Sequence, residues 1–231
     1  PRAEVVPDVP RADIEIDVDM ENSDVVYLWG THATVRTGAP TPATMRAGYR
    51  PFHTLAGGFP DEAEAFVAFW NWMHAVIDEC GRLGSTVRFY CYTDAENTRM
   101  HEIAARWPDF PGMPSHEAID AFCTTDAWVD LKKNVDSLIW PTDSLGLKKV
   151  APLAGFSWRD EDAGGDNSIL WYEIVVTTTD ESQRREMSEK LLRYNEDDVL
   201  ATKVLREWLD DGLNGRGPVF RGVTELDEHY E

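Results

Sequence analysis

The sequence has few of the features that mark membrane, secreted or nucleotide-cofactor proteins. It has no run of about eighteen apolar residues, and its Pro-rich, polar start predicts neither a signal peptide nor a membrane span. Its three cysteines, Cys80, Cys91 and Cys123, have no CxxC spacing, which argues against a disulfide framework or a zinc site. There is no GxGxxG sequence and no P-loop. We therefore expect a cytoplasmic protein in a reducing environment.

Basic residues are also scarce. The chain has 22 Lys and Arg against 42 Asp and Glu, a net charge of −20. Nonspecific affinity for nucleic acids comes mainly from Lys and Arg, so a broad phosphate-binding surface is disfavoured. Two interpretations remain. Bound cations reverse the sign of the charge at a local site, or the substrate is not a nucleic acid.

The chain is long enough for one large α/β domain or two small ones. Its 231 residues are 42% hydrophobic and include nine tryptophans, which is enough for a substantial core. We expect a linker at residues 1–12, one domain at 13–211 and a loosely ordered tail at 212–231. Because the chain starts with Pro1, we expect it to be a trimmed form or a piece of a longer protein.

Hydrophobic periodicity predicts a mixed β-sheet flanked by α-helices, whose first three strands form an antiparallel meander. The predicted strands lie near residues 14–21, 25–34, 49–56 and 86–92. The predicted helices lie at 61–83, 95–107, 116–123, 127–139, 145–154, 167–176 and 180–211. The polar, Gly-rich residues 157–168 are predicted to form a loop.

The first predicted strand has one apolar and one acidic face. With a period of two, Asp17, Asp19 and Glu21 share a face. Clustered carboxylates repel one another unless a cation neutralises them, and hard oxygen ligands suit Mg²⁺ or Mn²⁺. The alternative is an ordinary solvated strand face.

Two later segments add candidate ligands. Asp94 and Glu96 lie where a buried strand runs into a helix, although an acid at a helix start is often only an N-cap. In the last helix, Tyr194 and Asp198 fall in the apolar seam of Leu191, Tyr194, Ala201, Leu205 and Trp208. A carboxylate facing the interior needs a partner or a cation. Asp197 lies off this seam and is expected to face solvent.

Together these segments resemble the ribonuclease H-like exonucleases of the DEDD class, in the tyrosine-bearing variety. Asp19-Met-Glu21 resembles their DxE motif, and Tyr194 through Asp198 resembles their YxxxD motif. More specifically, the chain resembles the ribonuclease H-like domain that follows a RecB-type module in a family of bacterial nucleases. The landmarks of this resemblance are Val25–Gly30, Tyr92–Glu96, Val129–Leu131, Gly146–Lys149, Ala154–Phe156 and Tyr194–Leu209.

The resemblance implies a ribonuclease H-like fold and two-metal hydrolysis of single-stranded DNA or RNA ends in the 3′-5′ direction. Two Mg²⁺ or Mn²⁺ ions, about 4 Å apart, would be held by the carboxylates Asp19, Glu21, Glu96 and Asp198. Tyr194 would orient the attacking water, and Lys148 or its neighbour Lys149 would contact a phosphate. The alternative for the two lysines is an ordinary exposed helix start. The resemblance also implies an N-terminal RecB-like module in the full-length protein.

The chain departs from the class at the middle motif, which normally carries Asp. Glu96 aligns best with that position, and nearby Asp94 is the alternative ligand or a substrate contact. This departure and the net charge leave two rival functions open. One is a catalytically degenerate interaction domain, and the other is a phosphodiesterase for small nucleotides, which needs no basic groove.

Overall fold

The computed structural model describes residues 4–5, 7–55, 61–138, 140–160, 165–211 and 220–221. Its centre is a five-stranded sheet with the strand order β4-β3-β2-β5-β6. The strands are β2 (Ile14–Asn22), β3 (Val26–Val35), β4 (Gly48–His53), β5 (Val87–Cys91) and β6 (Trp128–Asp130). β2, β3 and β4 pair antiparallel, whereas β5 and β6 run parallel to β2. The predicted mixed sheet with an antiparallel start is therefore confirmed.

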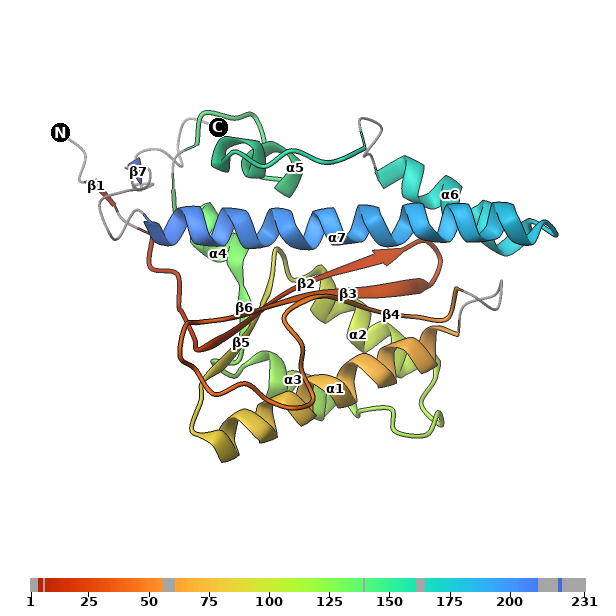
Figure 1. Cartoon of the computed structure of the whole chain (residues 1–231), viewed down its shortest axis with the longest axis horizontal. Coiled ribbons are helices and arrows are strands. Elements are labelled where there is room, and N and C mark those ends of the chain that lie inside the picture. The colour runs from red at the N-terminus through yellow and green to blue at the C-terminus, as the bar shows by residue number, and fades with distance from the viewer. Residues whose placement is uncertain are drawn as a thin grey trace.

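Helices cover both faces of this sheet (Figure 1). The lower layer in Figure 1 consists of α1 (Glu62–Leu83), α2 (Ala95–Arg106) and α3 (His116–Cys123). The long α7 (Glu181–Asp211) crosses the opposite face. The remaining elements are α4 (Leu131–Asp136), α5 (Leu147–Val150), the 3₁₀ helix η2 (Ala151–Ala154) and α6 (Gly165–Thr177). None of the helices in the described ranges has the length and hydrophobicity of a membrane-spanning segment.

Local sequence signals set the ends of α1. The Asp61 side chain caps its N-terminus by accepting a hydrogen bond from the Glu64 backbone N at 3.0 Å. Gly84 follows the last turn with φ of 73°, a left-handed conformation that glycine adopts without steric cost. Between these signals the helix buries an aromatic stripe, in which Phe69 stacks on Trp29 of β3 with ring centroids 4.8 Å apart. This stripe forms the main core between α1 and the sheet.

One predicted helix is wrong at its start. Residues 127–139 were predicted to be helical, but Trp128–Asp130 form β6, which pairs in parallel with β5. Only Leu131–Asp136 are helical. Strand pairing with Phe89 through Cys91 outweighs the local helix preference of this stretch. The predicted helix at 145–154 is likewise divided into α5 and η2, and Pro152, which has no backbone N–H, lies at the start of η2.

Two short strands lie in the stretches that were predicted to be a linker and a tail. Glu4–Val5 form β1, which pairs antiparallel with Phe220–Arg221 of β7. Val9 and Ala12 are buried, within the stretch predicted to be a linker. Apart from β7, the predicted tail at 212–231 lies outside the described residues.

Candidate active site

The acidic face of β2 is not solvated. It lies under α7, and Arg206 of α7 neutralises the N-terminal half of this face, which consists of Glu15 and Asp17. The guanidinium of this fully buried arginine donates to both carboxylate oxygens of Asp17 at 2.8 Å and to Glu15 at 2.9 Å. It also lies 4.4 Å from the ring centroid of Tyr90. Glu15 and Asp17 are therefore structural, which removes Asp17 from the shared cation site that the strand pattern suggested.

Among the described residues, no arginine pairs with the C-terminal half of the same face, which consists of Asp19 and Glu21. There Asp19 and Glu21 meet Asp198 of α7, and one oxygen from each carboxylate lies within 4.8 Å of the other two. Glu21 and Asp198 are buried and Asp19 is half-buried. Burial, and then repulsion among the three groups, raises the pKa of Asp19 and of Glu21 well above the ordinary range. Acids of β2 and of α7, two elements remote from each other in sequence, therefore converge beside the sheet.

Asn195 holds the Asp19 carboxylate in place. Its Nδ2 donates to Asp19 Oδ2 at 2.8 Å, while its Oδ1 accepts a hydrogen bond of the same length from the Tyr49 hydroxyl of β4. Gly30 of β3, the register partner of Asp19, makes room for this side chain. A Cβ at Gly30 would lie only 1.7 Å from Asn195 Oδ1. The glycine in the Val25–Gly30 landmark is thus explained by the close approach of α7.

Gly30→Ala is therefore expected to displace Asn195 and release Asp19. We expect a loss of about 1–3 kcal/mol in the free energy of unfolding and a fall of roughly tenfold in Mn²⁺ affinity. Urea denaturation and calorimetry measure the two effects. Gly81→Ala is the matched control, because nothing lies within 4 Å of a Cβ there. If the Gly30→Ala and Asn195→Ala effects simply add in the double variant, the two sites are not coupled as described.

Tyr194 lies one turn before Asp198 and is also buried. Its hydroxyl accepts a hydrogen bond from Lys148 Nζ of α5 and interacts with the Asp198 carboxylate. Burial and the nearby carboxylates raise the pKa of the Tyr194 phenol far above neutrality. The phenol therefore stays protonated and can donate a hydrogen bond, but it cannot act as a base at neutral pH.

A loop at residues 156–160 holds the other side of Asp198. Trp158 Nε1 donates to Asp198 Oδ1 at 2.5 Å. Next to it, Arg159 pairs with Asp197, with 2.7 Å between Nε and Oδ1, and with Glu196 at 2.8 Å. The expectation that Asp197 faces solvent is wrong, because its side chain is buried under this loop. The loop supplies Arg159 as a partner for Asp197, a residue that the helical seam alone predicts to be exposed.

Glu96 and Asp94, the candidates of the middle motif, lie in different environments. Glu96 is buried in the first turn of α2 and is not part of the group of three carboxylates. It is near enough to raise the pKa of Asp19. Its own pKa is raised to about 8, by burial and then by Asp130 and Asp94. Asp94 is exposed at the N-cap of α2 and makes no capping hydrogen bond. Asp130 caps α4 by accepting a hydrogen bond from the Lys132 backbone N.

The residues present fit a divalent cation. All three grouped side chains offer carboxylate oxygen, the donor that Mg²⁺ and Mn²⁺ prefer. Glu21 Oε1 and Glu96 Oε2 are buried without a hydrogen-bond partner among the described residues, and such atoms are costly unless something binds them. Asp19 and Glu21 lie near the C-terminal end of β2, the end at which ligands bind in open α/β sheets.

The comparisons with known proteins agree with this arrangement. Residues 93–210, just over half of the chain, match the RNase H superfamily. The chain belongs to the RNase H superfamily. No curated protein and no solved structure is significantly similar to it. The matched region contains Glu96, Lys148, Tyr194 and Asp198, whereas Asp19 and Glu21 precede it. Membership indicates a nuclease-type function, and enzymes with an RNase H fold usually use divalent metals.

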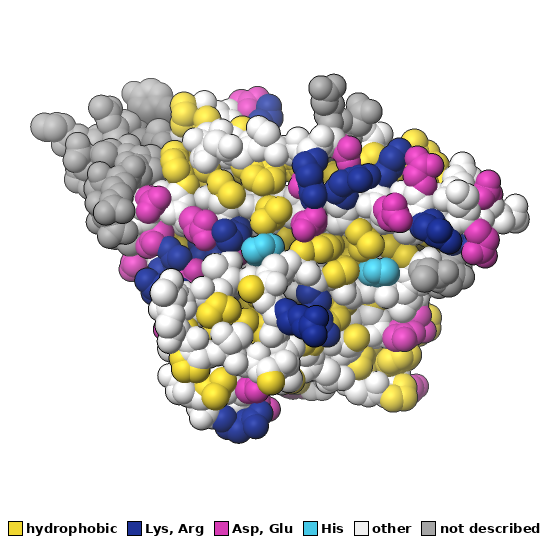
Figure 2. Space-filling model, in the orientation of Figure 1, with side chains coloured by type: hydrophobic (Ala, Val, Ile, Leu, Met, Phe, Trp, Pro, Cys, Tyr) yellow, Lys and Arg dark blue, Asp and Glu magenta, His cyan; other side chains and the backbone are white. Residues whose placement is uncertain are grey.

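The charges around this RNase H site are mixed. In Figure 2, Lys and Arg side chains gather along the α7 face among Asp and Glu side chains. Arg159 and Arg193 both form ion pairs with neighbouring acids, Arg193 with Asp160 at 3.7 Å. The described residues visible on this face therefore form no continuous basic surface, in agreement with the net charge of −20.

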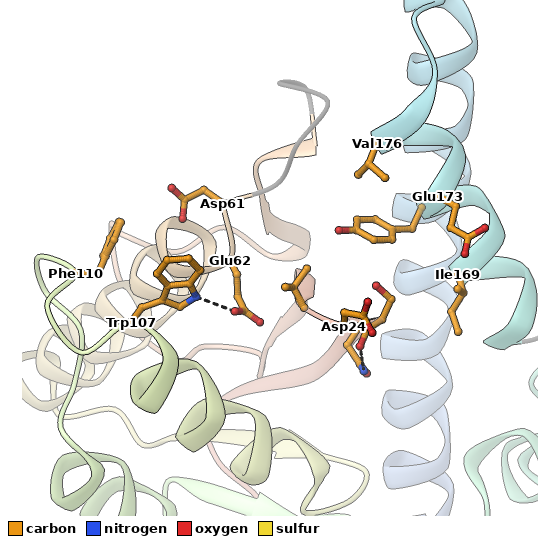
Figure 3. Close-up of a pocket in the computed structure, with 12 residues that line it drawn as sticks. Asp24, Asp61, Glu62, Trp107, Phe110, Ile169, Glu173 and Val176 are labelled. Carbon is orange, nitrogen blue, oxygen red and sulfur yellow. Dashed lines mark hydrogen bonds between the residues drawn. The ribbon is translucent and has the colours of Figure 1, made fainter.

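A pocket of about 880 Å³ lies beyond Glu21, where β2 turns into β3. Figure 3 shows Ile169, Glu173 and Val176 of α6 on one side and Asp61, Trp107 and Phe110 on the other. Its described lining residues include four acids and no Lys or Arg. The pocket therefore suits an uncharged, flat or apolar group better than a phosphate.

Asn195, Tyr49 and Trp158 were not among the predicted site residues. Asn195 lies inside the YxxxD motif, where its position next to Tyr194 was a usable signal. Tyr49 and Trp158 come from separate segments, and only the fold brings them to Asn195 and Asp198. No pattern within either segment predicts that contact.

Proposed function

We propose that the chain is a divalent-metal-dependent nuclease that removes nucleotides from single-stranded ends in the 3′-5′ direction. Within the RNase H superfamily, we assign it to the tyrosine variety of the DEDD class. The observation that supports this most is the convergence of Asp19, Glu21 and Asp198, with oxygens within 4.8 Å of one another. The Tyr194 hydroxyl beside Asp198 supports the tyrosine variety in particular.

In this proposal Asp19, Glu21 and Asp198 would hold the divalent cations, and the nearby Glu96 would be a further ligand. Divalent cations in such sites supply Lewis-acid activation of the phosphate and of the attacking water. Asn195 and Trp158 keep the Asp19 and Asp198 carboxylates in fixed rotamers through their hydrogen bonds. Ligands fixed in this way lose little conformational freedom when a cation binds.

Tyr194 would orient the attacking water by turning its single O–H from the Asp198 carboxylate to that water. Its raised pKa supports the role of a donor over that of a base. Lys148, which contacts the Tyr194 hydroxyl, is placed to meet a negatively charged phosphate entering the site. The pocket next to Glu21 would receive the terminal base, because its apolar wall suits a base and its acids repel a phosphate.

The decisive experiment is a cleavage assay on single-stranded DNA and RNA labelled at the 5′ end. With Mn²⁺ or Mg²⁺ we expect a ladder that shortens stepwise from the 3′ end, and chelation with EDTA should stop it. A strand blocked at its 3′ end by an inverted nucleotide is the control for polarity. Intact labelled strands after incubation with Mn²⁺ would contradict the nuclease proposal.

The net charge of −20 favours one alternative, a phosphodiesterase for very short substrates. Long polyanions are repelled by such a protein, whereas a dinucleotide carries a single internal phosphate. Cleavage of dinucleotides without cleavage of twenty-nucleotide strands would select this alternative.

Because Glu96 lies outside the carboxylate group, a degenerate interaction domain is the other rival. It predicts no Mn²⁺ binding in calorimetry.

A further inference from the structure

Lys148 occupies a position that a phosphate contact alone does not explain. Its Nζ donates to the Tyr194 hydroxyl and lies 4.5 Å from the centroid of the Tyr194 ring. It also lies 5.9 Å from the ring centroid of Trp158. Both aromatic residues contact Asp198, through the Trp158 Nε1–H and the Tyr194 hydroxyl. The ammonium group is thus bracketed by two side chains that bind one ligand carboxylate.

The electrostatics of the cluster agree with this placement. Burial raises the pKa of Asp19, Glu21 and Asp198, and the Lys148 ammonium opposes that rise at each of the three. The nearby arginines have other partners, since Arg206 of α7 binds Glu15 and Asp17. Arg159 binds Glu196 and Asp197. Lys148 therefore lies, through the Tyr194 hydroxyl, beside a carboxylate group with which neither arginine pairs.

We propose that Lys148 is the internal counter-ion of the Asp19–Glu21–Asp198 cluster and that it opposes divalent-cation binding until a phosphate arrives. The proposal rests on the proposed function. Two positive charges that share the same carboxylates repel each other in a buried site. A substrate phosphate attracts the ammonium and removes that repulsion. Cation affinity and phosphate affinity should then be coupled, and by linkage each raises the other by the same factor.

Removing a residue that positions a ligand weakens Mn²⁺ binding, whereas removing Lys148 is expected to strengthen it. In calorimetric titrations without nucleotide, Lys148→Met is expected to bind Mn²⁺ roughly tenfold more tightly than the wild type. Addition of thymidine 5′-monophosphate should tighten Mn²⁺ binding to the wild type but not to Lys148→Met. At saturating Mn²⁺, cleavage by this variant should fall at least about tenfold, because the phosphate loses its partner.

Two variants control for structural effects. Lys149→Met removes the same charge one residue away, from a side chain that is 57% exposed and 3.6 Å from Asp143, and should keep the wild-type Mn²⁺ affinity. Lys148→Arg keeps the charge and should also keep that affinity. If Lys148→Met, folded by circular dichroism, binds Mn²⁺ as weakly as the wild type or more weakly, the counter-ion role is wrong. If the wild type binds no Mn²⁺, the proposed function itself fails.

Discussion

Asp198→Asn is expected to reduce phosphodiester cleavage by at least roughly a thousandfold, which corresponds to about 4 kcal/mol of activation free energy. The asparagine keeps the size of the side chain and an oxygen for the Trp158 hydrogen bond, but it loses the negative charge that a cation requires. Initial cleavage rates at saturating Mn²⁺, measured on the strands described above, give the ratio. Asp211→Asn changes an exposed acid at the end of the same helix and should leave the rate unchanged.

The same variant should be more stable than the wild type when cations are absent. The pKa of Asp198 is raised above its ordinary 3.8, chiefly by burial. The folded protein then binds the proton more tightly than the unfolded chain, so this group destabilises the fold as the pH rises above about 4. In EDTA we expect the melting temperature of Asp198→Asn to exceed that of the wild type by roughly 2–4 °C at neutral pH.

The comparison of melting temperatures has a clear opposite outcome. The difference between the variant and the wild type should shrink toward acidic pH, where the Asp198 carboxyl is protonated in both states. Mn²⁺ should stabilise the wild type but not the variant, because a ligand that binds only the folded state stabilises it. A variant that is less stable than the wild type in EDTA would show that the three carboxylates do not repel one another.

Arg206→Met is expected to lower the free energy of unfolding by about 3–5 kcal/mol, the usual cost of leaving buried charges without their partner. The change removes both hydrogen bonds to Asp17 and one to Glu15, two acids with no exposed surface. Glu15 keeps Arg11 as a partner, so the unpaired charge is that of Asp17. Such a loss is a large part of the stability of a typical domain. Urea denaturation monitored by tryptophan fluorescence measures it.

A compensated variant tests the reason for this loss. When Asp17→Asn accompanies Arg206→Met, the unpaired buried charge disappears while Glu15 keeps Arg11 as its partner, and much of the stability should return. Lys203→Met is the control on the same helix, because Lys203 pairs with Glu207 at 3.0 Å near the surface and should contribute less than about 1 kcal/mol. An equal loss in Arg206→Met and Lys203→Met would mean that the arginine does not secure α7 to the sheet.

Much of the fold could be predicted from periodicity. The alternation in Ile14–Asn22 correctly placed the apolar side chains of β2 on one face and the acids on the other. The seam of α7 correctly predicted that Tyr194 and Asp198 are buried. β6 was missed because a three-residue strand contains too little periodicity, and its pairing with β5 is a contact between segments remote in sequence.

The site was harder to predict because its details depend on partners from other segments. The acidic pattern of β2 does not reveal that Arg206 pairs with Asp17, whereas Asp19 and Glu21 group with Asp198. The burial of Asp197 depends on Arg159, 38 residues earlier in the chain. The middle motif shows Glu96 in a plausible position, but it does not show that this carboxylate lies outside the group of three.

Because α7 is one continuous helix, the contacts that fix its register against the sheet also set the position of its site residues. Arg206 fixes its register against Glu15 and Asp17, and the same uninterrupted helix carries Asp198 eight residues earlier. Each residue turns an α-helix by about 100°. Deleting one residue between the two positions would leave Arg206 paired with Glu15 and Asp17 and would rotate Asp198 away from Asp19. Such a deletion would preserve the fold but separate Asp198 from Asp19 and Glu21, the acids that make the protein a nuclease candidate.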